Sequence, residues 1–183
     1  MTREEAIKFL ESNLTNKNLL KHCYASEVVM KYLAHIFGED KEKWALAGLL
    51  HDIDYDFTKD DLSKHSLIGA DMLREAGFTD DIVQAVKVHN NRHGIPRVSL
   101  MDKCLFSTDP VTGLIVAAAL IKPEKKLAAI DVDFLMNRFH EKSFARGANR
   151  VTIATCSDFG MNLEEFLGLS LEAMQNIAPV LEL

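Results

Sequence analysis

The chain has 183 residues, of which 48% are hydrophobic and 26% charged, and a formal net charge of −6 at pH 7. This length fits one domain that buries a substantial core without disulfide or zinc staples. The negative charge argues against generalised binding to nucleic acid or to an anionic membrane. The three cysteines form no CxxC pair, which is typical of small buried residues in a reducing compartment.

The first residues and the most apolar segment favour a cytoplasmic protein. The start, MTREEAIKFL, lacks the basic-then-apolar layout of a signal peptide. The most apolar run, at residues 114–121, is far shorter than the roughly 20 residues that a membrane span requires. We therefore expect a cytoplasmic protein that does not contact a membrane.

Helical spacing of apolar residues recurs along the whole chain, and the strict alternation of half-buried strands is absent. Glycines mark several helix ends, and the pair Asp109-Pro110 is typical of an N-cap followed by proline at the first helical position. The pattern predicts helices at about residues 3–12, 18–37, 41–52, 61–76, 80–89, 98–108, 110–121, 132–143, 145–158 and 162–178. The sequence thus predicts one all-α domain over residues 1–183.

Four of the seven histidines fall on apolar faces of four different predicted helices. A single histidine in such a place is more often a hydrogen-bonded core residue than a ligand, and Asp109 alone is explained as an N-cap. Together with two aspartates, however, the four histidines resemble a ligand set for a divalent metal such as Mn, Fe, Co, Ni or Zn. The absence of thiolate argues against a structural zinc site. The set is His22, His51, Asp52, His65, His89 and Asp109.

The order of these residues resembles that of the HD-domain superfamily of metal-dependent phosphohydrolases. The phrase LLHDID resembles its HD signature, and HSLIGADML resembles the HSxxGA segment of members with extra histidines. The segments TDPVTGLI and KSFARGANRVTIATCSDFGMNLEEF resemble a small bacterial subgroup of predicted HD hydrolases. The resemblance implies an HD-like metal-binding core at about residues 18–121 and a C-terminal helical extension at about 122–183.

The resemblance also implies a role for each ligand. His22, His51, Asp52 and Asp109 look like the ligands of a primary metal. His65 and His89 look like those of a second metal, with Asp52 bridging. The HD-GYP cyclic-dinucleotide phosphodiesterases have two adjacent histidines where this chain has His89-Asn90, and their GYP signature is missing here. The six-residue set is closer to that of the HD enzymes that split diadenosine tetraphosphate.

Two residues near this set are candidates for catalysis. Asp54 could orient a ligand histidine through a hydrogen bond, or could serve as a general acid or base. The alternative is an ordinary loop acid. His93, in the loop HNNRHG behind His89, could contact substrate or donate a proton.

A phosphate substrate needs cationic contacts, and residues 122–150 carry seven Lys or Arg against four acids. Basic residues recur every four positions from 138 to 150, which would form one stripe on a continuous helix. The alternative is a solvated face. If the stripe faces the pocket, Arg146 and Arg150 are the preferred phosphate contacts, since guanidinium binds phosphate oxygens bidentately. Lys103, close to Asp109 in sequence, is a weaker candidate. The cluster is too small for a nucleic-acid footprint.

These observations lead to three hypotheses of function. The first is a metal-dependent phosphohydrolase, in which metal-bound hydroxide attacks a small phosphate ester or phosphoanhydride; a nucleotide or dinucleoside polyphosphate is the leading candidate. The second is a di-iron HD-type oxygenase. The third is a metal-stabilised nucleotide-binding or regulatory module without catalysis. Apolar residues of the C-terminal segment could pack on the same chain or on a second copy, so a homodimer is among the expected states.

Overall fold

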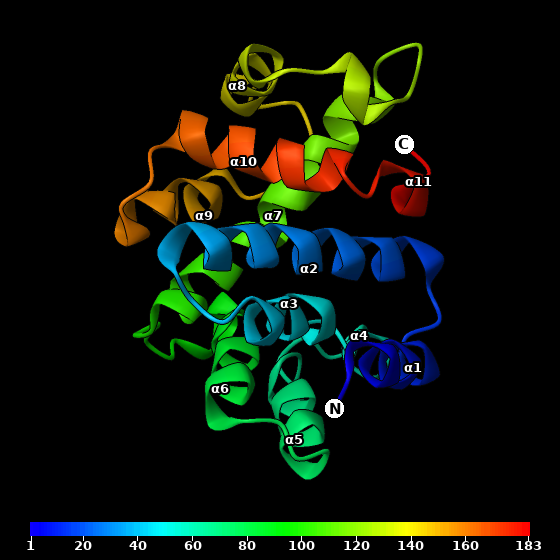
Figure 1. Ribbon diagram of the computed structural model, residues 1–183, viewed down its shortest axis with the longest axis vertical. Coiled ribbons are helices and arrows are strands. Elements are labelled where there is room, and N and C mark those ends of the chain that lie inside the picture. The colour runs from blue at the N-terminus through cyan, green and yellow to red at the C-terminus, as the bar shows by residue number, and fades with distance from the viewer.

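A computed structural model describes residues 1–183 and shows helices joined by turns, with no strand (Figure 1). The longer helices are α1 (Arg3–Asn13), α2 (Lys17–Phe37), α3 (Lys41–Leu50), α5 (Leu67–Glu75), α6 (Asp80–Val88), α7 (Leu100–Leu120), α8 (Val132–His140) and α10 (Leu163–Gln175). The shorter ones are α4 (Tyr55–Thr58), α9 (Arg150–Ala154), α11 (Ala178–Leu181) and the 3-10 helices η1 (Asn91–His93), η2 (Leu127–Ala129) and η3 (Thr155–Phe159). The prediction of an all-α fold is confirmed.

Side-chain caps begin several of the helices. Thr2 and Glu5 form a capping box at the start of α1, and Asn16 accepts backbone N–H groups at the start of α2. α2 ends at Gly38, whose φ of 70° lies in the left-handed region that glycine adopts without a steric penalty. Ser99 forms a second capping box at the start of α7.

α7 is one continuous helix where the sequence predicted two. The pair Asp109-Pro110 lies in its interior, so the predicted helix boundary at this pair is wrong. An interior proline removes one backbone hydrogen bond and normally kinks or breaks a helix. Here residues on both sides of it, such as Leu105 and Ile115, are fully buried in the same core. Burial of both halves outweighs the cost of the proline, and Asp109 projects from the middle of the helix.

The segment that precedes α5 is also less helical than predicted. The helix expected from about residue 61 begins only at Leu67, because Ser66 has a φ of 72°. A left-handed serine interrupts the helical path. The chain from His51 to Ser66 therefore forms turns and the short α4, and this irregular segment carries several of the candidate site residues.

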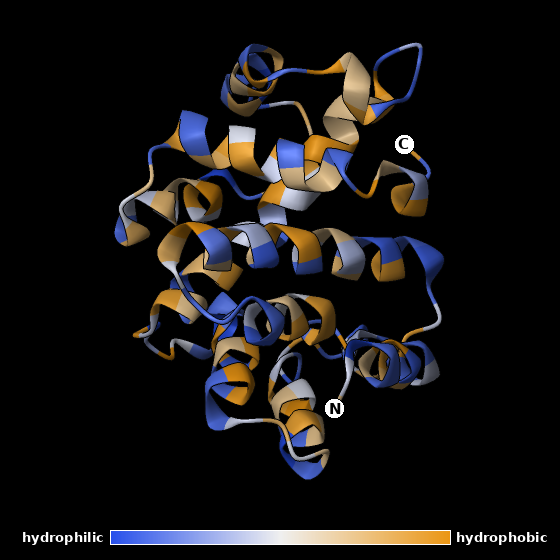
Figure 2. Ribbon diagram, in the orientation of Figure 1, coloured by the Kyte–Doolittle hydropathy of each residue, from blue (hydrophilic) through white to orange (hydrophobic).

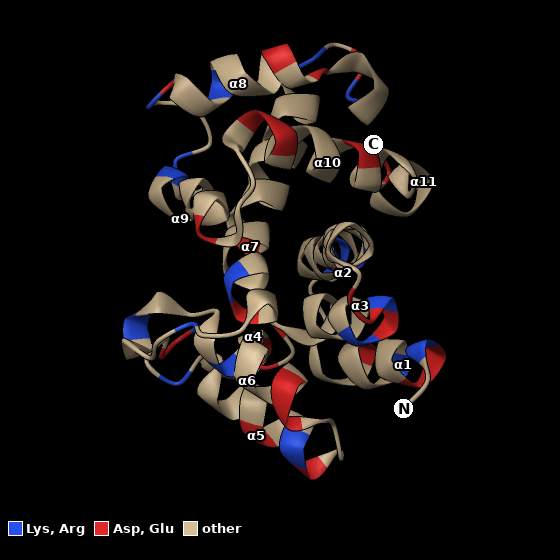
Figure 3. Cartoon of the chain, turned by 60° about the vertical axis from the view of Figure 1, so that its left-hand side comes forward, with Lys and Arg blue, Asp and Glu red and all other residues tan.

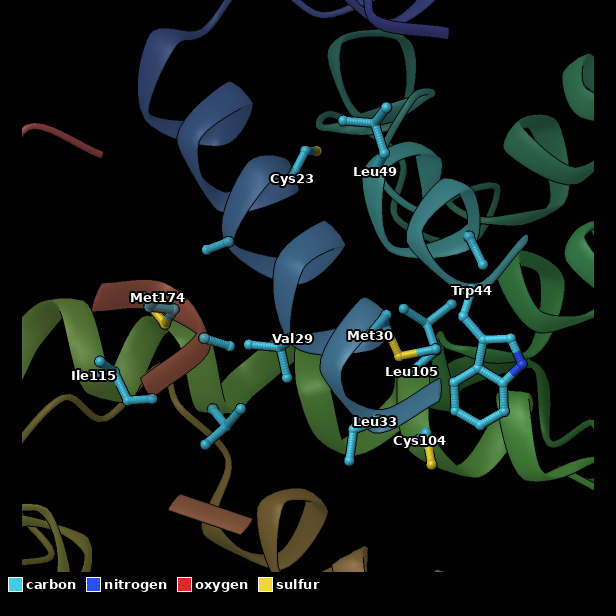
Figure 4. Close-up of a cluster of buried hydrophobic side chains, with 14 of the residues drawn as sticks. Cys23, Val29, Met30, Leu33, Trp44, Leu49, Cys104, Leu105, Ile115 and Met174 are labelled. Carbon is cyan, nitrogen blue, oxygen red and sulfur yellow. The ribbon is translucent and has the colours of Figure 1, made fainter. Parts of the chain in front are cut away.

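The helices share one hydrophobic core that reaches from the first helix to the last. A connected cluster of 42 buried residues extends from Ala6 to Leu181. α2 crosses the centre of the molecule, with α3, α5 and α6 on one side and α8, α9 and α10 on the other (Figure 1). Hydrophobic and hydrophilic residues alternate along the helices (Figure 2). Figure 4 shows Met30 of α2 beside Leu105 of α7, and Met174 of α10 beside Ile115 of α7.

α2 and α3 make the closest helix pair because of one glycine. A Cβ atom at Gly48 would lie 2.5 Å from the backbone oxygen of Ser26, so only glycine permits this approach. The close packing brings the end of α3 against the first half of α2. It thereby places His51 beside His22, two of the predicted ligands.

α7 meets the length and hydropathy criteria of a membrane span, although the apolar run expected from the sequence was shorter. Of its most apolar 18-residue stretch, 61% is buried inside the protein. A helix at the centre of a protein core has the same composition. Because α7 contacts α2, α6, α8, α9 and α10, its hydropathy is explained by these packing partners.

Candidate metal centre

The six predicted ligand residues converge at the junction of α2, α3, α6 and α7. Two histidines sit at helix C-caps, one after α3 and one after α6, and one aspartate projects from the middle of α7. The residues brought together are His22, His51, Asp52, His65, His89 and Asp109. Residues that lie up to 87 positions apart thus share one site, since positions 22 and 109 are in contact.

One half of the site lies between α2, α3 and α7. The Nε2 atom of His22 is 3.2 Å from Asp109 Oδ1 and 3.0 Å from the Nε2 atom of His51. Asp52 borders the same space, with its Oδ2 3.6 Å from His22 Nε2 and its Oδ1 3.5 Å from His51 Nε2. His51 is fully buried, whereas the side chain of Asp109 is 40% exposed. This half is therefore open to solvent only along Asp109 and His22.

The other half lies between the irregular segment before α5 and the end of α6. Asp52 Oδ1 is 3.3 Å from His65 Nε2 and 3.5 Å from His89 Nε2. The ligand atoms of these three residues lie within 4.8 Å of one another, as do those of His22, His51 and Asp52. Asp52 thus belongs to both groups and stands between them.

Each of the four imidazoles turns its Nδ1 atom away from the centre and toward a hydrogen-bond acceptor. The acceptors are Thr112 Oγ1 for His22 (2.9 Å), Gly48 O for His51 (2.8 Å), Asp54 Oδ1 for His65 (2.8 Å) and Val86 O for His89 (2.6 Å). The two carbonyls belong to the last turns of α3 and α6, where backbone oxygens lack helical partners. The Thr112 hydroxyl donates to the carbonyl of Asp109 at 2.9 Å, so it accepts from His22. In the neutral rings Nδ1 therefore carries the proton and the Nε2 lone pair faces inward.

The donor set fits a divalent transition metal. With both Nδ1 atoms protonated, His22 and His51 point two Nε2 lone pairs at each other across 3.0 Å, an arrangement that a cation relieves. Imidazole nitrogen and carboxylate oxygen suit Mn, Fe, Co, Ni or Zn. Burial raises the pKa of Cys23, beside His22 in the chain, well above its ordinary value, so its thiol stays neutral. The centre is therefore a nitrogen and oxygen site without thiolate.

The electrostatics of the metal-free centre differ from residue to residue. Burial lowers the pKa of His51 to about 4, so this ring is neutral near pH 7. Burial also opposes the charged form of His65, but Asp52 and Asp54 outweigh it and raise the pKa of His65 to about 10. The pKa of Asp52 lies well below its usual range: burial acts against this, and the surrounding histidines outweigh burial. A protonated His65 therefore balances the buried carboxylates when no metal is bound.

Asp54 is placed to orient His65, the first of the two roles predicted for it. Its side chain is fully buried, and Oδ1 accepts from His65 Nδ1. Oδ2 accepts the backbone N–H groups of Ser66 and Gly69, each at 2.8 Å. A Cβ atom at Gly69 would lie 3.2 Å from Asp54 Cγ, so glycine leaves room for the carboxylate. Both oxygens of Asp54 are thus hydrogen-bonded, and the carboxylate holds the His65 ring and the start of α5 together.

His93 supports the loop before α5, and its contact with substrate stays a prediction. Its Nε2 atom lies 2.7 Å from the carbonyl oxygen of His65 and donates to it. Asn90 donates to the same oxygen at 3.1 Å. The two side chains fix the backbone beside a ligand. Sequence reasoning missed this role of Asn90, although its place directly after His89 is a signal for it.

The guanidinium of Arg150, a predicted phosphate contact, is hydrogen-bonded to backbone carbonyl groups. It donates to the carbonyl oxygens of Arg138, Phe139, Phe144, Ala145 and Ala148. These bonds hold together the turns between α8 and α9, where Ala145 has a φ of 41°. The helix predicted at 145–158 is replaced there by turns, α9 and η3, so the basic residues from 138 to 150 do not form one stripe.

The other two predicted cations have free side chains at different places. Arg146 is exposed and precedes Gly147, which lines a cavity beside His65. Lys103 is half-buried on the second turn of α7 and lines neither of the two cavities next to the centre. Lysines, arginines and acids are scattered over the helices (Figure 3). Arg146 itself does not line the cavity, but of the predicted cations it is the one whose chain neighbour does.

Two cavities adjoin the metal centre. A polar one of about 240 Å3 borders His65, His89 and Asp109, and its wall includes Asn90 and Asn149. A larger one of about 480 Å3 lies between α2, α7 and the C-terminal residues, and it borders His22 and Thr112. Small molecules can therefore approach the ligand side chains from two directions.

The sequence matches the HD domain family over residues 19–142, somewhat beyond the core expected at 18–121. The chain belongs to this family. HD domains are a family of metal-dependent phosphohydrolases, so the resemblance inferred from the motifs is confirmed. The matched segment contains all six candidate ligands and the orienting residue Asp54.

Among similar proteins, Ribonuclease Y of Lawsonia intracellularis is 28% identical over 123 residues, which cover 64% of this chain and 24% of that protein. Ribonuclease Y of Oleidesulfovibrio alaskensis is 29% identical over 98 residues, which cover 54% of this chain and 18% of that protein. The uncharacterized protein MJ0778 of Methanocaldococcus jannaschii is 33% identical over 94 residues, which cover 49% of this chain and 54% of that protein. The chain thus spans less than two thirds of each of these relatives. No solved structure matches the chain.

Proposed function

We propose that this HD domain hydrolyses a small phosphate monoester or phosphoanhydride, with nucleotides and dinucleoside polyphosphates as the leading candidates. One observation carries the proposal: four imidazole Nε2 atoms and two carboxylates converge beside a polar cavity, with every Nδ1 proton committed elsewhere. A centre that served only to hold the fold together would be closed. Here the Asp109 side chain is 40% exposed.

The arrangement supports two ions. His22, His51, Asp52 and Asp109 would hold the first, and Asp52, His65 and His89 the second. The two oxygens of Asp52 support this sharing, because Oδ2 faces His22 while Oδ1 faces His51, His65 and His89. When bound, the ions would supply an activated water and a Lewis acid for phosphoryl oxygens.

The residues of the chain then have separable tasks. In the hydrolysis, the oxygen of water forms a bond to phosphorus, the P–O bond to the leaving group breaks, and the leaving oxygen gains a proton. The polar cavity borders the centre beside Asp109, and Asn90 and Asn149 line this route for water and for released phosphate. Arg146, exposed next to this cavity, is the side chain available to balance phosphate charge.

Metal stoichiometry tests the centre itself. The measurement is elemental analysis of protein purified without a metal-binding tag, in parallel with His65→Ala. We expect about two ions per chain in the parent and about one in the variant, since His65 belongs to one half alone. A chain that takes up no metal after reconstitution with Mn, Fe, Co, Ni or Zn contradicts the proposal.

Turnover separates the three hypotheses. The metal-loaded protein is assayed for phosphate release from mononucleotides, dinucleoside polyphosphates and simple phosphate esters. Release by the parent and not by Asp52→Ala supports a hydrolase. Iron together with oxygen-dependent turnover and an EPR signal indicates the di-iron oxygenase. Tight nucleotide binding without turnover indicates a regulatory module.

A second candidate is cleavage of phosphodiester bonds in RNA, which the similarity to proteins named Ribonuclease Y favours. Against it stand the net charge of −6 and the mixing of both charges over the surface (Figure 3). The same preparation is therefore incubated with a short RNA oligonucleotide. Cleavage that is lost in Asp52→Ala and exceeds phosphate release from the small esters would move the assignment to RNA.

A further inference from the structure

The larger of the two cavities has the size and position of a substrate pocket. It measures about 480 Å3, twice the volume of the polar one, and falls within the range of small-molecule sites. One face of the first half of α2 forms its floor, with His22 at the end that belongs to the metal centre. The opposite end is bordered by Glu182, which pairs with Lys21 at 2.5 Å. The cavity thus leads from a metal ligand to the C-terminal residues, near α11 in Figure 1.

The walls of this cavity are apolar and small where they meet the centre. Ala25 and Gly113 face it beside the metal end, and Val116, Leu120 and Leu181 line it farther out. Polar side chains stand mainly at its two ends. Such walls favour an apolar ring or chain over a sugar, whose hydroxyl groups would lose water without gaining hydrogen bonds.

Gly113 provides an independent reason to regard the space as kept for a ligand. It lies in the interior of α7, where glycine is less stable than alanine. No atom lies within 4 Å of a Cβ atom built at this position, so packing does not require glycine there. The two other helical glycines near the centre have close neighbours: a Cβ atom at Gly48 would meet backbone, and one at Gly69 would lie 3.2 Å from Asp54 Cγ. Gly113 is exposed on this mostly buried helix. An exposed glycine at the wall of an apolar cavity, next to a metal ligand, is explained if a bound group covers it.

We infer that this cavity binds the organic group of the substrate, and that the substrate is a phosphate ester of an apolar aromatic or alkyl alcohol. The inference rests on the proposed phosphohydrolase function and narrows its substrate. An ester with an apolar organic group is favoured over the nucleotides named above, because the apolar walls disfavour their sugar. The phosphate lies at the metal centre beside His22, and the apolar group extends along α7 past Gly113. The polar cavity on the His65 side remains for water and for release of phosphate.

Enlarging the side chain at position 113 tests the inference. The variants Gly113→Ala, Gly113→Leu and Gly113→Phe fill the cavity stepwise and favour the helix. Hydrolysis of 1-naphthyl phosphate and of glycerol 3-phosphate is measured for each manganese-loaded protein. We expect the ratio of kcat/KM values, naphthyl over glycerol, to fall with side-chain size, and by about tenfold or more in Gly113→Phe, mainly through KM. Ile36→Phe, which adds a ring at an exposed position on the far end of α2, should keep the parental ratio.

Binding of 1-naphthylphosphonate, which cannot be hydrolysed, separates a failure of this inference from a failure of the proposed function. Calorimetry on the parent and on Gly113→Phe, with thermal unfolding as a check of the fold, gives the second readout. Weaker binding in the variant without hydrolysis of any ester supports the pocket and contradicts the hydrolase. Hydrolysis with an unchanged ratio in a folded Gly113→Phe overturns the pocket and leaves the hydrolase. A parent that does not bind the phosphonate also overturns the pocket.

Discussion

The two halves of the metal centre are built in different ways. In the first half, His22 and Asp109 project from the long helices α2 and α7, and His51 caps α3. These helices pack through the core, so the core itself holds the ligands in place. In the second half, His89 caps α6, but His65 belongs to the irregular segment before α5, and its position depends on Asp54, His93 and Asn90.

The halves also differ in charge before any metal binds. His51 is neutral near pH 7, since burial lowers its pKa to about 4. His65 carries a proton, since Asp52 and Asp54 raise its pKa to about 10 against the effect of burial. In the first half the lone pair of His51 is preformed, although for His22 burial is outweighed by the carboxylates of Asp109 and Asp52, which raise its pKa. In the second half a metal must displace the proton of His65. One centre can thus contain a site whose ligands are held mainly by helix packing and a site in which a ligand is held mainly by hydrogen bonds.

Asp52→Ala should impair both halves of the centre, because Asp52 is the one residue common to both. We expect phosphate release to fall by more than about 100-fold, the upper range for loss of a group that merely supports a ligand. Metal content should fall in both halves. Elemental analysis and the phosphate-release assay measure the two effects.

The matched control is Asp56→Ala. Asp56 lies four residues farther on and accepts the backbone N–H and the hydroxyl of Thr15, each at 2.7 Å. Its loss affects a surface contact outside the centre, so turnover and metal content should stay at the parental level. Equal losses in the two variants would mean that Asp52 acts through the fold and not through metal.

Asp54→Asn should weaken the second half alone. The amide matches the carboxylate in size, and its oxygen stays on the two backbone N–H groups of Ser66 and Gly69. Its NH2 group then faces His65 and cannot accept from Nδ1. Facing an NH2 group, His65 moves its proton to Nε2 and loses the inward lone pair. We expect the affinity for the second ion to fall by about 10- to 100-fold, with the first ion retained. Metal titration followed by calorimetry resolves the two steps, and Asp61→Asn on the exposed loop serves as control.

Much of this centre could be predicted from the sequence, because residue type and helical spacing are local properties. Four inward histidines and two aspartates were identified from them. Asp109 was also interpreted as an N-cap, since Asp-Pro is a local signal for a helix start; only the burial of α7 on both sides of Pro110 overrides that signal.

The supporting residues depend on the tertiary path of the chain and were harder to predict. The partners of Asp54 come from a turn in which Ser66 adopts a left-handed conformation, which helical spacing does not reveal. Arg150 meets five carbonyls because the chain between α8 and α9 coils around it. Thr112 lies three residues after Asp109, a spacing that could have indicated its contact.

The affinity for the second ion should depend on pH. Below a pKa of about 10, His65 must release a proton before it binds metal. The affinity should therefore rise by about tenfold per pH unit from pH 7 to 9 and level off above the pKa. His51, with a pKa of about 4, adds no proton release in this range. Calorimetry in buffers with different ionisation enthalpies should show about one proton released with the second ion. An enthalpy independent of the buffer would contradict a protonated His65.

Thr112→Val gives the smallest expected effect and the sharpest comparison. The change removes the acceptor of the His22 Nδ1 proton, as Asp54→Asn does for His65, and keeps the shape of a fully buried side chain. His22 is also held by its place on α2, so the affinity for the first ion should fall only a few-fold, near the low end of the range for an orienting partner. The measurement is the same metal titration. A loss as large as that of Asp54→Asn would show that the Thr112 hydrogen bond, and not helix packing, positions His22. A few-fold loss would attribute the difference between the two halves to the helices that carry the first.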